Sequence, residues 1–571
     1  PRDPAWWVLA PASALALGIV LLALGLRGMG IHIPHGASSP PAAVSPTPSP
    51  TPRPAVWIAP DVPGEVALPI ASWVSAHPEA ATLASAPEGA AVAVQMSPTE
   101  WTAPLWERIY VVAVPYKSRL TSLGSDALRQ LLQSPGVVLD IERLASLGTD
   151  ALRQQWQAAS EEKGLRWLAE PEALDAMEAL LGPQGQGVSL DLVPREQLAS
   201  RAWEAEQVLA FLPFDHLEPR LRPLQVDGYA VLDPTDRLER YPLALRAYIR
   251  GPAALVQALT EAVRARTPLT NRDPARFASL AVTGNVSLTR GVAVQMDALS
   301  DPGHPVRGIG PRLAQADATL VGLLAPFTPA CQPQEAMTRF CSRPAYVEAL
   351  RVMGADAVYL TDGHLADFGP EGISFSLGLL EDKGFPVVGT GRNRKEAFQT
   401  RILSVGGARV ALLAYNQAGP PEAWATEEGP GTARFDLEAA RTAVVQARAA
   451  ADLVLVLVQH EDRYSALPNP QERLDFRALA DAGADLIVGT EAHEPRAAEF
   501  YGKALLAYGL GNPVSDQMWS PRTRQSTVLW CTFYGGRWLG VDLLPTQMEP
   551  DGQARWLAGA EARAALEDLL P

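Results

Sequence analysis

Five short apolar segments in the C-terminal half of the chain, each followed directly by polar residues, constrain the fold more than any other feature. Leu453–Val458 is an uninterrupted run of leucine and valine, which is typical of a strand that is buried on both faces. Such runs, separated by segments with helical spacing, predict an α/β fold with a parallel or mixed sheet. The five predicted strands are Phe277–Val282, Ala355–Leu360, Leu453–Val458, Leu486–Val488 and Ala504–Tyr508.

The residues that follow these strands are of the types that form a polar or metal-binding site. The carboxyl ends of parallel strands meet at one edge of a sheet, so we expect these side chains to lie close together. Histidine nitrogens and carboxylate or amide oxygens are ligands that divalent metals use in proteins. The candidate metal or polar residues are Asn285, Asp362, His460, Glu461, Glu491 and Asn512, and the candidate catalytic residues are His364, Asp367 and His493.

The N-terminal segments predict a membrane-anchored protein. Residues Trp6–Leu26 carry no charge, and the run is long enough to cross a bilayer as one helix. A cleavable signal peptide is the alternative, but the apolar run is longer than such peptides usually have. Residues 37–54 form a Pro/Ser/Thr-rich tract, which predicts an extended linker. Because 571 residues are too many for one core, we expect two further domains, over residues 55–270 and 275–571.

These segments predict a single-pass protein of the cell membrane whose globular domains lie on the extracytoplasmic side. In that oxidising compartment Cys331 and Cys341 can close a small loop as a disulfide, whereas a cytosolic protein would keep two unpaired thiols. Cys531 is then expected to be free and buried. The net charge of −15 argues against a nucleic-acid partner, because phosphate binding requires a positive field. Tight binding of an acidic polymer would require a local cationic cleft.

Residues 55–270 alternate strand-like and helix-like segments, which predicts an α/β domain with a mainly parallel sheet. The stretches YVVAVPYKS, LRPLQVDGYAVLD and RYPLALRAYI resemble the type 2 periplasmic solute-binding proteins. This resemblance implies two lobes that close over a ligand, here a small anionic solute, although no ligand residue can be matched. An α/β scaffold without a ligand is the alternative. The predicted strands are Tyr110–Pro115, Gly136–Leu139 and Gln207–Leu212, and the predicted helices are Leu123–Gln133, Thr149–Ala159 and Ala253–Arg264.

From about Ala275 to its end, the chain resembles the CapA family of poly-γ-glutamate capsule biosynthesis proteins. The resemblance rests on FCSRPAYVEALRVMGADAVYLTDGHLADFGPEG (Phe340–Gly372), on the block Asp475–Met518, and on the tail FYGGRWLGVDLLP. It implies a metallophosphatase-like fold of four layers (α/β/β/α), in which two sheets pack face to face and a metal site lies at the strand ends. It also implies a role in capsule or surface-polymer biogenesis in a bacterial cell envelope.

Several ligand-type positions of this family are changed in the chain. A two-metal centre needs many carboxylate, amide and histidine ligands around both ions. The changes therefore predict a degenerate site, either metal-free or with one divalent metal, and leave open whether the domain is an enzyme. The changed positions are Asn285 for an aspartate, Leu324 for a glutamate, Gly363 for an asparagine, Gln459 for a histidine that His460 follows one step later, and Thr490 and Glu491 for two histidines.

Three functions stay open on the sequence alone. The first is a membrane-anchored CapA-like protein that works with capsule or cell-envelope polymer machinery. The second is a metal-dependent hydrolase of a phosphoester or an amide, with His364 or His493 as the acid or base. The third is a solute-binding receptor whose CapA-like domain is a docking surface.

Overall fold

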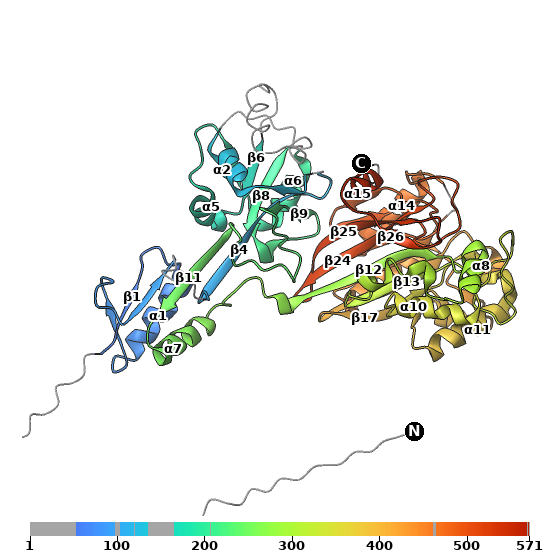
Figure 1. The fold of residues 1–571 in the computed structure, drawn as a ribbon, viewed down its shortest axis with the longest axis horizontal. Coiled ribbons are helices and arrows are strands. Elements are labelled where there is room, and N and C mark those ends of the chain that lie inside the picture. The colour runs from blue at the N-terminus through green and yellow to red at the C-terminus, as the bar shows by residue number, and fades with distance from the viewer. Residues whose placement is uncertain are drawn as a thin grey trace, which may run out of the picture. The chain divides into compact units, whose positions relative to one another are not determined.

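A computed structural model describes residues 53–96, 103–118, 120–134, 165–205, 207–460, 464–567 and 569. The expected membrane segment at residues 6–26 and nearly all of the linker at 37–54 lie outside the described residues. So do the expected strand Gly136–Leu139, the expected helix Thr149–Ala159, and Glu461. Within the described part of the chain, no helix combines the length and the apolar character that a bilayer crossing requires. Many of the helices and strands named below are labelled in Figure 1.

The N-terminal region is built on a nine-stranded sheet in the order β2-β1-β3-β11-β4-β8-β6-β7, with β9 on β4. The sheet is mixed, not mainly parallel as expected, because β4 runs antiparallel to β8, β9 and β11. β4 lies between β8 and β11, and the segment from β8 to β11 contains β9 and β10 but no α-helix. The strands are β1 (Ala55–Ile58), β2 (Thr82–Ala84), β3 (Val92–Gln95), β4 (Trp106–Pro115), β6 (Arg166–Ala169), β7 (Ser189–Leu192), β8 (Val208–Pro213), β9 (Leu221–Pro223) and β11 (Ala244–Arg250), with β5 (Ser122–Leu123) and β10 (Gln225–Val226) paired separately.

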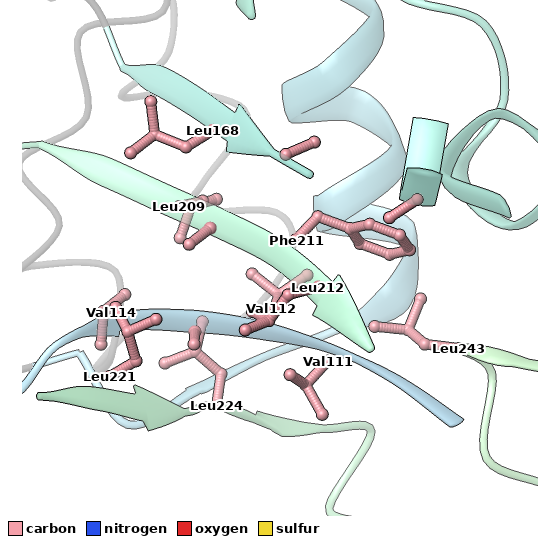
Figure 2. Close-up of a cluster of buried hydrophobic side chains, with 14 of the residues drawn as sticks. Val111, Val112, Val114, Leu168, Leu209, Phe211, Leu212, Leu221, Leu224 and Leu243 are labelled. Carbon is pink, nitrogen blue, oxygen red and sulfur yellow. The ribbon is translucent and has the colours of Figure 1, made fainter. Parts of the chain in front are cut away.

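Two hydrophobic cores lie in this region. One core gathers Val56, Val66 and Ile70 with residues of β3 and α7. The other, drawn in Figure 2, packs Val112 and Phe211 of neighbouring strands against helices on the sheet. The helices are α1 (Gly64–Ala76), α2 (Ser125–Gln133), α5 (Leu174–Leu181), α6 (Arg195–Glu204) and α7 (Ala253–Arg264), so the helix expected at Leu123 begins two residues later.

The C-terminal region contains two larger sheets. The first has the order β15-β14-β13-β12-β24-β25-β26, and the second has the order β17-β18-β20-β21-β23-β22. The strands of the first sheet are β12 (Phe277–Val286), β13 (Ala318–Leu323), β14 (Ala357–Tyr359), β15 (Val387–Val388), β24 (Gln525–Tyr534), β25 (Arg537–Met548) and β26 (Ala554–Trp556). Those of the second are β17 (Arg401–Val405), β18 (Ala408–Asn416), β20 (Leu453–Gln459), β21 (Leu486–Gly489), β22 (Ala498–Tyr501) and β23 (Ala504–Ala507), and β16 (Thr390–Gly391) pairs with β19 (Gly431–Thr432).

The two sheets pack face to face between layers of helices. Leu280 and Leu320 of the first sheet share one core with Leu455 and Leu457 of the second. Because side chains alternate along a strand, Val456 of the same strand β20 points into a different core, under the helices. The architecture is therefore α/β/β/α. Helices α8 (Arg290–Leu299), α9 (Gly310–Leu313), α10 (Glu348–Val352) and α11 (Gly369–Asp382) contribute to the core of the first sheet, α12 (Arg394–Ala397), α13 (Leu437–Ala450) and α14 (Pro470–Asp481) to that of the second, and α15 (Gly559–Leu566) follows β26.

Candidate functional site

Four strands of the C-terminal region bring polar side chains together at their carboxyl ends. Asn285 lies near the end of β12, Asp362 follows β14, Gln459 ends β20, and Glu491 follows β21. Asn285 Nδ2 donates to Asp362 Oδ2 at 3.0 Å, and Gln459 Nε2 donates to Glu491 Oε2 at 2.8 Å. A side-chain hydrogen bond links Asp362 and Glu491. These four residues thus form one buried row, which we call the amide–carboxyl chain.

The surroundings of Asp362 in the amide–carboxyl chain favour the protonated form of its carboxyl group. Asp362 is only 2% exposed and Glu491 9% exposed. Burial, followed by the charge of Glu491 and the hydrogen bond to it, raises the pKa of Asp362 well above its ordinary value. A nearby like charge and the loss of hydration both disfavour the ionised carboxylate, so Asp362 favours its protonated form.

Several buried polar atoms around the amide–carboxyl chain have no protein partner. They include the carbonyl oxygens Asn285 Oδ1 and Gln459 Oε1 and the hydroxyls of Thr361 and Thr490. Since buried polar atoms are usually paired, this concentration of acceptors fits a group that donates hydrogen bonds, or a cation. Within the described residues, however, no group of three or more His, Cys, Asp or Glu side chains is arranged to hold a metal ion.

The two-metal centre implied by the resemblance to the CapA family does not fit these residues. Leu324, which stands where the family has a glutamate, is buried and apolar and has no atom that can bind a metal. The oxygens of Asp362 accept from Asn285 and from the backbone N–H of His364. The expectation of a metal-free or single-metal site therefore stays a prediction.

The two candidate catalytic histidines each follow a carboxyl residue of the amide–carboxyl chain by two positions, His364 after Asp362 and His493 after Glu491, and each has a side-chain partner. His364 Nδ1 lies 2.8 Å from Asp367 Oδ2, and its ring stacks on Phe340 with the centroids 4.0 Å apart. His493 Nδ1 lies 3.1 Å from Asn512 Nδ2, so this nitrogen accepts a hydrogen bond from the amide. The side chain of His364 is 37% exposed, whereas His493 is buried.

His460 lies apart from the amide–carboxyl chain, contrary to the expectation that it joins the other candidates. Its Nε2 lies 3.3 Å from Asp475 Oδ2 on α14, and its ring contacts Phe476 of the same helix edge to face. Neighbouring residues of a strand point to opposite faces, so Gln459 points toward Glu491 and His460 toward the helix layer. Gln459, rather than the predicted His460, is therefore the residue of the site at the end of β20.

Asn416 is a second site residue that the sequence analysis missed. It ends β18, is fully buried, and its Oδ1 accepts from the backbone N–H of Gly419 at 2.7 Å. Its Nδ2 donates to the carbonyl oxygen of Thr361 at 2.8 Å and so positions the segment that carries Asp362. The signal was present, because Asn416 follows the apolar run Ala411–Tyr415 as the other site residues follow theirs.

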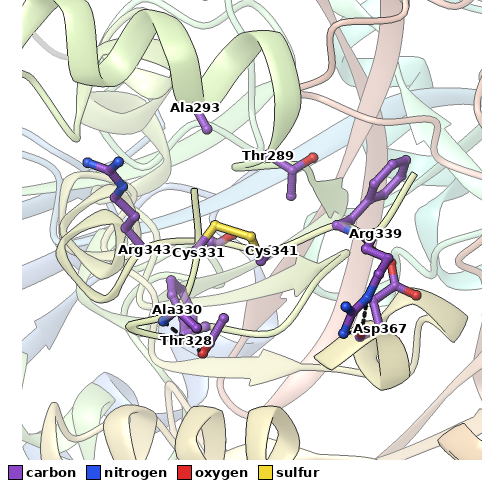
Figure 3. The surroundings of a disulfide bond; sticks show 12 residues. Thr289, Ala293, Thr328, Ala330, Cys331, Arg339, Cys341, Arg343 and Asp367 are labelled. Atoms are coloured by element: carbon purple, nitrogen blue, oxygen red, sulfur yellow. Dashed lines mark hydrogen bonds between the residues drawn. A yellow bond between two sulfur atoms is a disulfide. The ribbon is translucent and has the colours of Figure 1, made fainter. Parts of the chain in front are cut away.

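A disulfide-closed loop covers His364. Cys331 and Cys341 are joined, with their Cα atoms 5.6 Å apart, and Cys531 is free and buried. The backbone N–H of Phe340 donates to Asp367 Oδ2 at 2.6 Å, and Arg339 Nε donates to the carbonyl oxygen of Asp367 at 2.8 Å (Figure 3). The loop therefore fixes both the ring that stacks on His364 and the carboxylate that binds it.

Replacing both Cys331 and Cys341 by serine is expected to lower the free energy of unfolding by about 2–4 kcal/mol, because the open loop has more conformational freedom in the unfolded chain. It is also expected to increase the modification rate of His364 by diethylpyrocarbonate, since Phe340 is no longer held over the ring. Mass spectrometry of the modified peptide measures that rate. Phe340→Ala with the disulfide intact serves as a comparison, expected to expose His364 at a smaller cost in stability. An unchanged rate in both variants would contradict the proposed cover.

Comparison with known proteins gives one family match and several relatives. Residues 279–517 match the family model "Bacterial capsule synthesis protein PGA_cap". The chain is 30% identical over 187 residues to "Capsule biosynthesis protein CapA" of Bacillus anthracis, which covers 32% of this chain and 45% of that protein. It is 30% identical over 184 residues to "PGA biosynthesis protein CapA" of Bacillus subtilis, covering 32% and 48%. The chain thus spans about half the length of these relatives.

Solved structures give weaker similarities. An ABC-type phosphate transport receptor from Vibrio cholerae is 11% identical and covers 37% of this chain and 93% of its own, with a TM-score of 0.24. The NAD nucleotidase of Haemophilus influenzae is 11% identical and covers 51% and 62%, with a TM-score of 0.30. Scores this low do not establish a common fold.

Proposed function

We propose that the protein takes part in the biogenesis of a poly-γ-glutamate-type capsule or surface polymer, because residues 279–517 match the family model of bacterial capsule synthesis proteins. The family match is the observation that carries the proposal. The names of the two Bacillus relatives, which refer to capsule and to PGA biosynthesis, support it. In this role the protein works beside the polymer machinery of the cell envelope.

The proposed place of action is the outer side of the cell membrane. The uncharged segment Trp6–Leu26 is the proposed anchor, and the Pro/Ser/Thr-rich tract after it holds the globular part away from the bilayer. The bond between Cys331 and Cys341 supports an oxidising compartment, because disulfides are rare where thiols are kept reduced.

We further propose that the C-terminal site recognises a ligand rather than hydrolysing one at two metal ions. The support is the amide–carboxyl chain, which joins Asp362 and Glu491 to each other and to two amides. His364 and His493 likewise each have one ring nitrogen bound to a neighbouring side chain. A site of this kind offers unpaired hydrogen-bond acceptors, which suit a donor-rich group of a substrate or partner.

Deleting the gene in its own organism is expected to lower the amount of cell-associated γ-glutamyl polymer, measured by acid hydrolysis and glutamate analysis. The full chain supplied in trans should restore it, sediment with membranes, and be cleaved by protease added to intact protoplasts. The double variant Asp362→Asn, Glu491→Gln should restore less polymer if the site recognises a ligand. Undiminished polymer in the deletion strain would contradict the proposed function, and several-fold stimulation of hydrolysis by added manganese would favour the hydrolase alternative.

A further inference from the structure

A pocket with a volume of about 300 Å³ gathers positive charge in this otherwise acidic protein. Arg195 and His216 of the N-terminal region line it together with Lys503 and Arg537 of the C-terminal region. Within the described part of the chain, no ion pair involves Arg195, Lys503 or Arg537, whereas most other arginines around the molecule have a carboxylate partner. We call this site the cationic pocket.

The carboxylates that line the cationic pocket only partly offset its charge. Glu218 is paired with Arg220, outside the pocket lining. His216 is already bound through Nδ1 to Glu170 Oε2 at 2.6 Å. Only Glu196 faces the pocket without an ion-pair partner among the described residues. Among the lining residues, three cations thus oppose one unpaired carboxylate, and Arg537 also donates to the backbone carbonyl oxygen of Asp215 at 2.6 Å.

Two further features favour an anion in the pocket. Helix α6 begins at Arg195 without a side-chain cap, since Pro194 precedes it, and its first-turn residues line the pocket. The amino end of a helix carries partial positive charge and uncapped N–H groups, which attract anions. In addition, partial burial and then repulsion from Arg195 lower the pKa of Arg537. A bound anion would relieve that repulsion.

The walls of the pocket suggest what kind of anion fits. Its apolar side chains are leucines and one alanine, which can contact the methylene groups of a ligand. Guanidinium groups bind carboxylates through paired hydrogen bonds, and a lysine adds a mobile positive charge. A group that combines methylenes with a carboxylate therefore matches both the apolar walls and the cationic side chains of the pocket. The apolar lining residues are Leu198, Ala199, Leu212, Leu217 and Leu221.

We propose that the cationic pocket binds a carboxylate-bearing unit of a γ-glutamyl polymer. This inference rests on the proposed function and names the ligand chemistry for a site distinct from the strand-end residues. The strongly negative charge of the whole chain repels a polyanion from most of its surface, so binding is concentrated where the cations are. Affinity is accordingly expected to fall as salt is added, because exposed charges are screened.

The test measures binding of a fluorescent γ-glutamyl oligomer to the purified full chain by anisotropy. The double variant Lys503→Gln, Arg537→Gln is expected to bind at least about tenfold more weakly, because two charge-assisted contacts are lost. Glu196→Gln is expected to bind more tightly. The control Arg266→Gln, Lys395→Gln removes the same charge at exposed positions outside the pocket lining and should change affinity by less than about twofold.

Two results would overturn the inference. Equal weakening in the pocket variant and the control would show that net charge alone governs binding. Binding of inorganic phosphate in the pocket without binding of the oligomer would show a small-anion site instead. The proposed function fails separately: if the deletion strain keeps its polymer while the pocket variant loses oligomer binding, the pocket stands without that role. If deletion abolishes the polymer but the pocket variant and the control variant bind the oligomer equally well, the proposed function stands without a role for the pocket.

Discussion

Replacing Arg496 by methionine is expected to lower the free energy of unfolding by about 3–5 kcal/mol. The side chains of Arg496 and Glu472 are 2% and 1% exposed, and two guanidinium nitrogens donate to the two carboxylate oxygens at 2.8 Å each. The guanidinium also donates to three backbone carbonyl oxygens, those of Ser465, Leu467 and Tyr508. Its loss leaves a buried negative charge and three unpaired carbonyl groups, which explains the size of the effect.

Urea unfolding of the full chain, followed by circular dichroism, measures this change as a shift in the midpoint. Arg441→Gln is the matched control, because it breaks an arginine–glutamate pair whose side chains are 43% and 78% exposed. That control is expected to cost less than about 0.5 kcal/mol. Adding Glu472→Met to Arg496→Met should recover part of the loss, because the uncompensated charge is removed. If Arg496→Met behaved like the surface control, the buried pair would not stabilise the fold as argued.

Replacing Asp362 by asparagine is expected to stabilise the protein at pH 7–8 and to flatten the dependence of its stability on pH. Burial and Glu491 raise the folded-state pKa of Asp362, whereas in the unfolded chain it is about 3.9. Between these two pKa values the folded protein holds a proton that the unfolded chain has lost. Stability therefore falls as the pH rises through this window, by up to about 1.4 kcal/mol per pH unit. Above the folded-state pKa the loss is complete.

The substitution can keep one hydrogen bond to Asn285. Asn285 Oδ1 has no partner and Asn285 Nδ2 donates to Asp362. Rotation of the Asn285 amide lets its oxygen accept from the introduced amide, while its Nδ2 gives up the bond to position 362. The backbone N–H of His364 still finds the remaining oxygen at position 362.

Urea midpoints at pH 5 and pH 8 measure the effect. Glu491→Gln should also flatten the pH dependence, because the charge of Glu491 is one of the causes that raise the pKa of Asp362. Asp61→Asn, at an exposed aspartate, is expected to leave the slope unchanged. A pH slope in Asp362→Asn as steep as in the unaltered protein would mean that other groups hold the proton.

The sequence predicted the strands of the C-terminal region well because their signal is local. The predicted strand Leu453–Val458 is β20, which extends one residue further to Gln459. The predicted helix Ala253–Arg264 is α7 with the same bounds. Pairing between distant strands has no such local signal, since it depends on how the whole chain closes. The antiparallel neighbours of β4 were therefore not foreseen, and the sheet of the N-terminal region was expected to be mainly parallel.

The site was predicted only in part, because the sequence does not show toward which face of a strand each side chain points. Asp362 and Glu491 could be found because they follow apolar runs and carry charge. Which of Gln459 and His460 joins the site depends on the direction in which each side chain points at the end of β20. Because histidine is a common metal ligand, His460 was expected in the site, but Gln459 is the residue that contacts Glu491. Asn416 was overlooked because amides at strand ends are common and this one contacts the site through a backbone carbonyl.

The continuous sheet of the N-terminal region has a mechanical consequence. In two-lobed binding proteins the lobes rotate about a hinge of a few residues that absorb large changes in backbone angles. Here the two cores are bridged by hydrogen-bonded strands, since β11 pairs with β3 on one side and with β4 on the other, and β4 pairs with β8. Relative motion of the two cores must bend or twist these hydrogen-bonded strands. We therefore expect small-amplitude bending of the sheet rather than a large hinge rotation that opens and closes a cleft.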